Sequence, residues 1–216
     1  MEADTVERDL RRAGALAALL AAVAVYSGFA RGLRRARGRT AGPMPTFQRS
    51  PLFFVPTGVG AVWLLYRMWH PLPPILWGRV RALATLVGAL LYFPGLALIL
   101  WGRVAMGEMH DISSSLGVQL YARHRLITSG PFGIVRHPMY VGGILAELGA
   151  VLLYRTWSVL LIALNAPVLV LRAHKEEEVL SAEFGEEWAE YSRRVPAWTP
   201  RLRVRAGQEQ GGRVNP

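Results

Sequence analysis

The chain contains no cysteine and only one lysine, Lys175. The first absence excludes a disulfide scaffold, a cysteine-ligated metal site and a cysteine nucleophile. The second means that arginine carries almost all of the basic charge. Lysine and arginine together number 25 against 15 acidic residues, so the chain is strongly basic. A net charge of +10 can serve nucleic-acid binding, but these arginines stand between apolar runs and not on a soluble face with stacking aromatics. The composition therefore favours anionic lipid headgroups over nucleic acid as partners.

Hydrophobic residues make up 52% of the sequence and are gathered in long runs. Runs of this kind are typical of a membrane protein rather than of a soluble core. The first run follows arginines, as a signal peptide would, but no cleavage pattern with a polar mature segment follows it. We predict an all-α, multi-pass integral membrane protein with about five transmembrane helices, expected over 13–30, 52–69, 82–101, 139–153 and 157–171.

The last two apolar runs are joined only by residues 154–156, a spacing that requires an antiparallel helical hairpin. Counted from this turn, Glu147 and Asn165 lie at about the same depth. A carboxyl group inside a bilayer is costly unless it is paired or neutral, so Glu147 is expected within hydrogen-bonding reach of Asn165 or of a cavity. A structural clasp between the helices is the favoured interpretation of this pair, and a catalytic role is the alternative.

Two polar clusters flank the hairpin, in segments 124–143 and 172–178. Both ends of a hairpin lie on one side, so these clusters are expected to close on one ligand. Arg172 and Glu176 are four residues apart and share a helix face, while Glu177 points about 100° away. The alternative for Arg172 and Glu176 is an ordinary salt bridge.

Arginine is concentrated in segments 31–49, 103–136 and 193–205, which five spans would place on one side of the membrane. The positive-inside rule makes that side cytoplasmic. The polar clusters and the C-terminus are then expected to face the cytoplasm, with the N-terminus outside, against the local pull of the arginines in 8–12.

Smaller patterns complete these expectations. Gly142, Ala146 and Ala150 repeat every four residues and predict close helix packing. Trp188 and Tyr191, beside two arginines, favour an anchor at the membrane surface over stacking on a ligand. Two histidines and an aspartate, His110, Asp111 and His124, lack the spacing of a helical metal motif, and no metal is expected.

The ordered motifs resemble a known family. HRLITSGPFGIVRHPMYVGG followed by RAHKEEEVLSAEFGEEWAEYSRRVP is similar to the isoprenylcysteine carboxyl methyltransferase family and its phospholipid N-methyltransferase relatives. Those families carry Arg-His-Pro-x-Tyr-x-Gly, then Arg-x-x-x-Glu-Glu-x-x-Leu and Phe-Gly-x-x-(Tyr or Trp)-x-x-Tyr. The resemblance covers about residues 119–200. It implies a membrane transferase that uses S-adenosylmethionine in a cytosol-facing pocket beside a lipid-accessible tunnel.

The resemblance also implies roles for individual residues. The residues implied to hold the cofactor are Gln119, His124, Arg125, Leu126, Ile127, Phe132, Arg136, His137, Pro138, Met139, Tyr140, Glu176 and Glu177. Arg172 and Glu176 would act at the reaction centre, and Arg172 and Glu147 would face the methyl acceptor. Phe132 departs from the tyrosine usual in the family and lacks its hydroxyl. Gln119 is a loose match, because its spacing from the following motif differs from the family pattern.

These residue types suit the cofactor. S-adenosylmethionine combines a sulfonium and an ammonium with a carboxylate and a flat adenine, so its site needs acidic, basic and apolar or aromatic walls. The side chains that offer such walls are Glu176, Arg136 or His137, and Leu126, Ile127 and Phe132. Methyl transfer needs no covalent enzyme intermediate, and its barrier falls mainly by positioning and desolvating the acceptor.

Three functions stay open from the sequence. The first is a methyltransferase acting on a prenylated thiol-acid, a phospholipid amine, or a small hydrophobic thiol or acid. The others are a transporter component, with Glu147 on its pathway, and an inactive scaffold, which Phe132 permits. The expected organisation is a tunnel-side helical part over 1–102, a methyltransferase core over 103–200 and a disordered tail over 201–216. A monomer or weak oligomer with membrane-lipid partners is expected.

Overall fold

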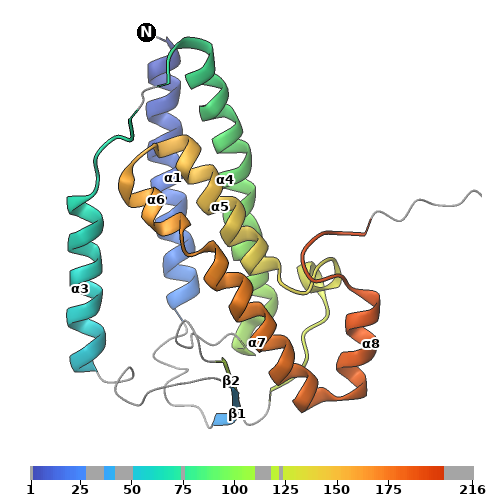
Figure 1. The fold of residues 1–216 in the computed structure, drawn as a ribbon. Helices are drawn as coiled ribbons and strands as arrows, with labels where there is room; N and C mark the ends of the chain where they lie inside the picture. The colour runs from blue at the N-terminus through green and yellow to red at the C-terminus, as the bar shows by residue number, and fades with distance from the viewer. Residues whose placement is uncertain are drawn as a thin grey trace, which may run out of the picture.

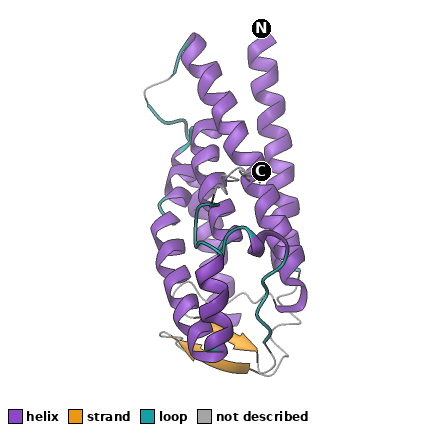
Figure 2. Ribbon diagram, turned by 90° about the vertical axis from the view of Figure 1, so that its right-hand side faces the viewer, coloured by secondary structure: helices purple, strands orange, loops and turns teal. Residues whose placement is uncertain are grey.

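The computed structural model describes residues 2–27, 37–41, 51–73, 76–109, 118–121 and 124–201. Helices and connecting loops make up these ranges apart from one small two-stranded sheet (Figure 1), which Figure 2 shows at one end of the molecule. The helices are α1 (Glu2–Tyr26), α3 (Pro51–Arg67), α4 (Gly78–Met106), α5 (Pro138–Tyr154), α6 (Trp157–Ala163), α7 (Ala166–Phe184) and α8 (Glu186–Arg194). The other elements are the 3-10 turns η2 (Gly107–Met109) and η3 (Gly130–Gly133), and the antiparallel strands β1 (Arg37–Ala41) and β2 (Val118–Tyr121).

Within the described residues, two helical segments are long and apolar enough to cross a membrane, Gly78–Met109 and Trp157–Phe184. Pro138–Tyr154 is a shorter apolar helix. Helix α3 runs apart from the main bundle and contacts α6 (Figure 1). The predicted helical class is confirmed except for the two strands, and the count of five spans stays a prediction. The end of the first expected span, 28–30, lies outside the described residues.

Close packing of α4 on α5 forms the centre of the bundle. Gly142, Ala146 and Ala150 of α5 are all buried. A Cβ atom added to Gly142 would lie 2.6 Å from the backbone oxygen of Gly95, and one added to Gly95 would lie 2.6 Å from the backbone nitrogen of Ala146. Only small residues allow two backbones to approach this closely. The predicted packing role of the four-residue repeat is therefore confirmed.

The hairpin after α5 turns at Arg155, the single non-glycine residue of the described ranges with a positive φ, at 53°. The predicted antiparallel return is confirmed, but the expected helix over 157–171 is broken. Helix α6 ends at Ala163, and α7 begins at Ala166 with Pro167 in its first turn. Proline has no N–H to donate to the preceding turn, so it suits the start of a new helix and not the interior of a continuous one.

A buried carboxylate, Glu7, links α1 to α4 and α5 at the end of the bundle where the chain turns at Arg155. Glu7 of α1 is 5% exposed and accepts a hydrogen bond of 2.9 Å from Arg81 of α4. It also pairs with Arg11 at 2.6 Å and with Arg155 at the hairpin turn. Burial raises the pKa of the Glu7 carboxyl, but the Arg81 hydrogen bond and the three guanidinium charges outweigh it, so the pKa lies below its ordinary value of 4.5. The cluster fixes α1 to α4 and α5.

Glu7→Gln is expected to lower the stability of the purified protein by about 2 kcal/mol at pH 7, because charge-assisted hydrogen bonds are lost. The folded pKa of Glu7 is lowered, so its contribution is complete above its ordinary pKa and is lost as the pH falls through the folded value. Thermal unfolding in detergent should show a Tm difference from wild type that shrinks below about pH 4. Asp4→Asn is the control, because Asp4 pairs with Arg81 at an exposed site. Equal Tm values for wild type and Glu7→Gln at pH 7 would contradict the account.

Candidate functional site

A cavity of about 550 Å³ lies where α5, α7 and α8 meet the segment that precedes α5. The ends of α1 and α4 complete its wall. The residues of its wall that the sequence marked are His124, Leu126, Ile127, Phe132, Arg136, His137, Pro138, Met139, Tyr140, Glu147, Arg172 and Glu176. The two polar clusters that flank the hairpin therefore close on one cavity, as the sequence predicted.

The remaining marked residues are Arg125, Glu177 and Gln119. Arg125 is exposed and is not part of the cavity wall. Glu177 lies behind the wall, where it contacts Arg136 and His137. Gln119 is on β2, and its side chain, like His110 and Asp111, lies outside the described residues. The roles implied for all of these residues stay predictions.

Tyr140, Arg172 and Glu176 form a compact polar group in the cavity wall. The Tyr140 hydroxyl donates a hydrogen bond to Glu176 Oε1. Arg172 Nε donates to the Tyr140 oxygen at 2.8 Å and approaches Glu176 Oε1 at 3.4 Å. The salt bridge between Arg172 and Glu176, the alternative interpretation from the sequence, is present, but it is shared with a phenol from the neighbouring helix. The group links the start of α5 to the middle of α7.

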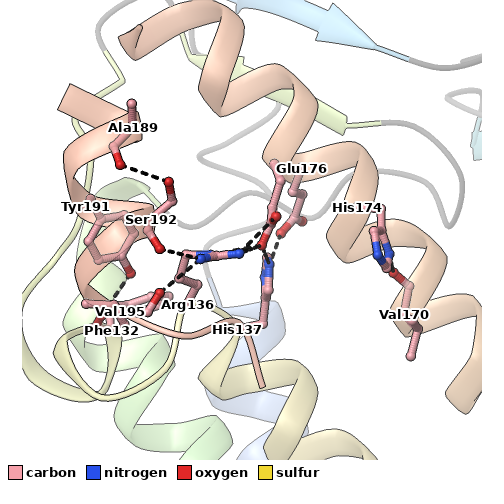
Figure 3. A network of polar contacts seen from close by, with 11 residues as sticks. Phe132, Arg136, His137, Val170, His174, Glu176, Ala189, Tyr191, Ser192 and Val195 are labelled. Carbon is pink, nitrogen blue, oxygen red and sulfur yellow. Dashed lines mark hydrogen bonds and ion pairs between the residues drawn. The ribbon is translucent and has the colours of Figure 1, made fainter. Parts of the chain in front are cut away.

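Arg136 and His137 both contact Glu177. Figure 3 shows the Arg136 side chain reaching from beside His137 to Ser192 and Val195. Arg136 Nε donates to Glu177 Oε1 at 3.0 Å and its second terminal nitrogen donates to Oε2 at 3.2 Å, a bidentate pair. His137 Nε2 lies 2.8 Å from Glu177 Oε1. Glu176 faces the cavity while Glu177 faces Arg136, as the predicted angle between adjacent helical residues requires.

Helix α8 covers the cavity. Trp188 and Tyr191 are 7% and 3% exposed, and both lie in the cavity wall. The Tyr191 hydroxyl donates to the backbone oxygen of Phe132 at 2.8 Å, and burial raises its pKa to about 12. The predicted surface anchor is therefore wrong, because α8 folds back and buries these two aromatic side chains.

The segment after α8 supports the site and was missed by the sequence analysis. The backbone N–H groups of Arg136 and His137 donate to the carbonyl oxygens of Pro196 and Ala197, at 2.8 and 3.2 Å. The Trp198 ring lies 5.4 Å from the His137 ring. The one feature of the sequence that could have indicated this contact is Trp198, an aromatic residue just beyond the end of α8.

Glu147 and Asn165 lie together in the same cavity wall. Glu147 therefore lies at a cavity, as predicted, with Asn165 in the same wall. Glu147 Oε2 is buried and has no hydrogen-bond partner among the described residues. The pair lies where α5 meets the start of α7, and one carboxyl oxygen of Glu147 lacks a hydrogen bond from the described residues.

The cavity offers the kinds of wall that S-adenosylmethionine requires. Phe132, Trp188 and Tyr191 supply flat aromatic surfaces, and Glu176 supplies a carboxylate. The volume lies within the range of small-molecule sites in proteins. In the part of the chain that the structure describes, no three histidine, cysteine, aspartate or glutamate side chains gather to hold a metal ion. The absence of a metal stays a prediction.

Known proteins with similar sequences are methyltransferases in two of the comparisons. Residues 83–187 match the family model described as phospholipid methyltransferase. The chain is 28% identical over 153 residues to protein-S-isoprenylcysteine O-methyltransferase B of Arabidopsis thaliana, covering 60% of this chain and 78% of the plant protein. Residues 83–187, which match the family model, include α5, α7 and most of the cavity wall.

Two further relatives are named for metal resistance. The cobalt-zinc-cadmium resistance protein CzcN of Cupriavidus metallidurans is 32% identical over 139 residues, which are 63% of this chain and 62% of that protein. The nickel-cobalt-cadmium resistance protein NccN of Alcaligenes xylosoxydans xylosoxydans is 37% identical over 81 residues, 36% of this chain and 37% of the relative. The chain thus spans less than two thirds of the length of each.

Proposed function

Because the chain belongs to the family of isoprenylcysteine carboxyl methyltransferases and phospholipid methyltransferases, we propose that it transfers a methyl group from S-adenosylmethionine to a lipophilic acceptor in the membrane. The observation that carries the proposal is the Tyr140, Arg172 and Glu176 group, which lies in one cavity between aromatic walls and an apolar section. The cofactor site and the C-terminus would face the cytoplasm, and the enzyme would act as a monomer or weak oligomer.

The cofactor would occupy the section of the cavity beside α8. Phe132, Trp188 and Tyr191 would contact its adenine, and Glu176 its cationic groups. When bound, S-adenosylmethionine supplies a sulfonium methyl group, which an acceptor atom takes by in-line displacement as the carbon–sulfur bond breaks. Trp188 and Tyr191 would exclude water from this section, which strengthens the contacts of Glu176.

The acceptor would enter the section lined by the transmembrane helices. Ile99, Val168 and Leu169 make this section apolar, and Glu147 and Asn165 add one polar pair. Candidate acceptors are an isoprenylcysteine-type carboxylate, a phospholipid amine and a small hydrophobic thiol. Each combines an apolar body with a nucleophilic atom, as this cavity requires.

Arg172 would position the acceptor at the junction of the two sections. Its Nε group is held by Tyr140 and Glu176, so the guanidinium plane is fixed. A fixed guanidinium can orient a carboxylate or a phosphate that carries the reacting atom. If the acceptor is an amine it must lose a proton, and Glu177 is already paired with Arg136 and His137. Glu177 is therefore a poor base for that proton.

Transfer of tritiated methyl from S-adenosylmethionine into membrane extract, followed by identification of the labelled product, tests the proposal. The protein in nanodiscs should label a lipophilic product, and Arg172→Met should lower the rate by roughly a hundredfold, which is about 2.7 kcal/mol. Glu178→Gln is the control, because Glu178 lies on α7 but is exposed and outside the cavity wall. An Arg172→Met rate equal to that of wild type would contradict the assignment, as would the absence of any labelled product.

A further inference from the structure

The cavity wall carries two separate polar groups on matching faces of α5 and α7. Tyr140, Gly143 and Glu147 are spaced by three and four residues, so they lie along one face of α5, and all three line the cavity. The bond of Tyr140 to Glu176 at one end, and the place of Glu147 and Asn165 in the same cavity wall at the other, show that α7 runs antiparallel beside this face. Seven helical residues separate the two polar groups by about 10 Å.

The surroundings of the second group are apolar. Ile99, Val168 and Leu169 line the cavity with it, and a Cβ atom added to Gly143 would lie 3.2 Å from Leu169 Cδ1. Glycine at 143 thus keeps the passage between the two polar groups from being narrowed further. A chain-like molecule can extend along this passage from Arg172 to Glu147.

Glu147 has more hydrogen-bonding capacity than its neighbours use. Both Glu147 and Asn165 line the cavity, and Glu147 Oε2 is buried and has no partner among the described residues. This oxygen is already out of contact with water and unpaired, which costs about 1–3 kcal/mol. A donor on a bound molecule, met by rotation of the Glu147 side chain toward the cavity that it lines, would recover this free energy. A tail made only of methylene or isoprene units would not.

We propose that Glu147 and Asn165 select acceptors that carry a hydrogen-bond donor in the tail, a hydroxyl, amide or amine, about 10 Å from the methylated atom. The inference rests on the proposed function, because it takes the Tyr140 and Arg172 end of the cavity as the point of transfer. Glu147 is then a specificity-determining residue for the acceptor tail. A purely hydrocarbon tail would be disfavoured.

Matched amphiphiles test this selection. The probes are ten-carbon thiols, amines and carboxylates, each with a plain chain and with a hydroxyl on carbon 8, which gives the spacing of the two polar groups. Binding to the protein in nanodiscs is measured by the rise in Tm, with and without S-adenosylhomocysteine. For the preferred head group, the hydroxylated chain should bind wild type about tenfold more tightly than the plain chain.

Variants of Glu147 identify the group responsible. Glu147→Leu should abolish the hydroxyl preference, and Glu147→Gln should keep part of it. Leu148→Ala is the control, because Leu148 is the next residue of α5, is half exposed and is outside the cavity wall. Equal binding of plain and hydroxylated chains to wild type would overturn the inference, and so would a preference that persists in Glu147→Leu.

The same samples separate this inference from the proposed function. Binding of S-adenosylhomocysteine without any hydroxyl preference would overturn the inference and leave the methyltransferase proposal standing. A hydroxyl preference without S-adenosylhomocysteine binding would support a tail site and count against the cofactor assignment.

Discussion

Gly142→Leu is expected to prevent the accumulation of folded protein or to lower its Tm by more than roughly 10 °C. A Cβ atom at Gly142 would lie 2.6 Å from the Gly95 oxygen and 3.0 Å from both the backbone nitrogen and Cγ1 of Ile99. Two of these atoms belong to the backbone, so no side-chain rotation relieves the clash. Leucine must therefore separate α4 from α5, and overpacking of this kind destabilises by several kcal/mol.

Gly60→Leu is the matched control for this prediction. Gly60 is also a helical glycine, in α3, but a Cβ atom there would meet nothing within 4 Å. Thermal unfolding and size-exclusion chromatography in detergent should leave Gly60→Leu close to wild type. If Gly142→Leu unfolded within about 2 °C of wild type, the close approach of α4 and α5 would not be a source of stability.

Arg136→Lys is expected to weaken S-adenosylhomocysteine binding by roughly a hundredfold, or about 2.7 kcal/mol, and to lower the Tm. Arg136 is 15% exposed in its side chain and joins three segments of chain. It forms the bidentate pair with Glu177 and donates at 2.9 Å to the carbonyl oxygens of Ser192 and Val195. Lysine keeps the charge but cannot make this planar set of hydrogen bonds, so α8 should detach from the cavity.

Calorimetry of S-adenosylhomocysteine binding and thermal unfolding together measure this effect. Arg193→Lys is the control, because Arg193 of α8 pairs with Glu186 while both side chains are more than half exposed. Both quantities should match wild type in that variant. Wild-type affinity in Arg136→Lys would show that Arg136 does not hold α8 over the cavity.

Much of the site could be predicted because the length of the hairpin and the periodicity of its helices are visible in the sequence. The hairpin spacing places Tyr140 beside Glu176 because turn residues and helix periodicity fix which ends meet. The separation of Glu176 from Glu177 follows from the same periodicity. Both predictions depend only on helix periodicity and turn length, which can be inferred from a single sequence.

The position of α8 could not be predicted in the same way. Gly185, with a φ of 51°, allows the chain to turn sharply between α7 and α8. The direction of that turn is set by the Arg136 hydrogen bonds to the end of α8 and by the burial of Trp188 and Tyr191. These are long-range contacts, and an amphipathic helix with two aromatic residues and two arginines at its end is equally consistent with a membrane anchor. The break before Pro167 was missed because the apolar run continues through it.

Titration of S-adenosylhomocysteine into the purified protein in nanodiscs tests the central claim most directly. The account predicts one molecule bound per chain and no measurable binding to Glu176→Ala, because that variant removes the carboxylate that faces the cavity beside Tyr140 and Arg172. Glu178→Ala, an exposed position on the same helix, should bind as wild type does. Absence of binding to the wild-type protein, or equal binding to Glu176→Ala, would contradict the account.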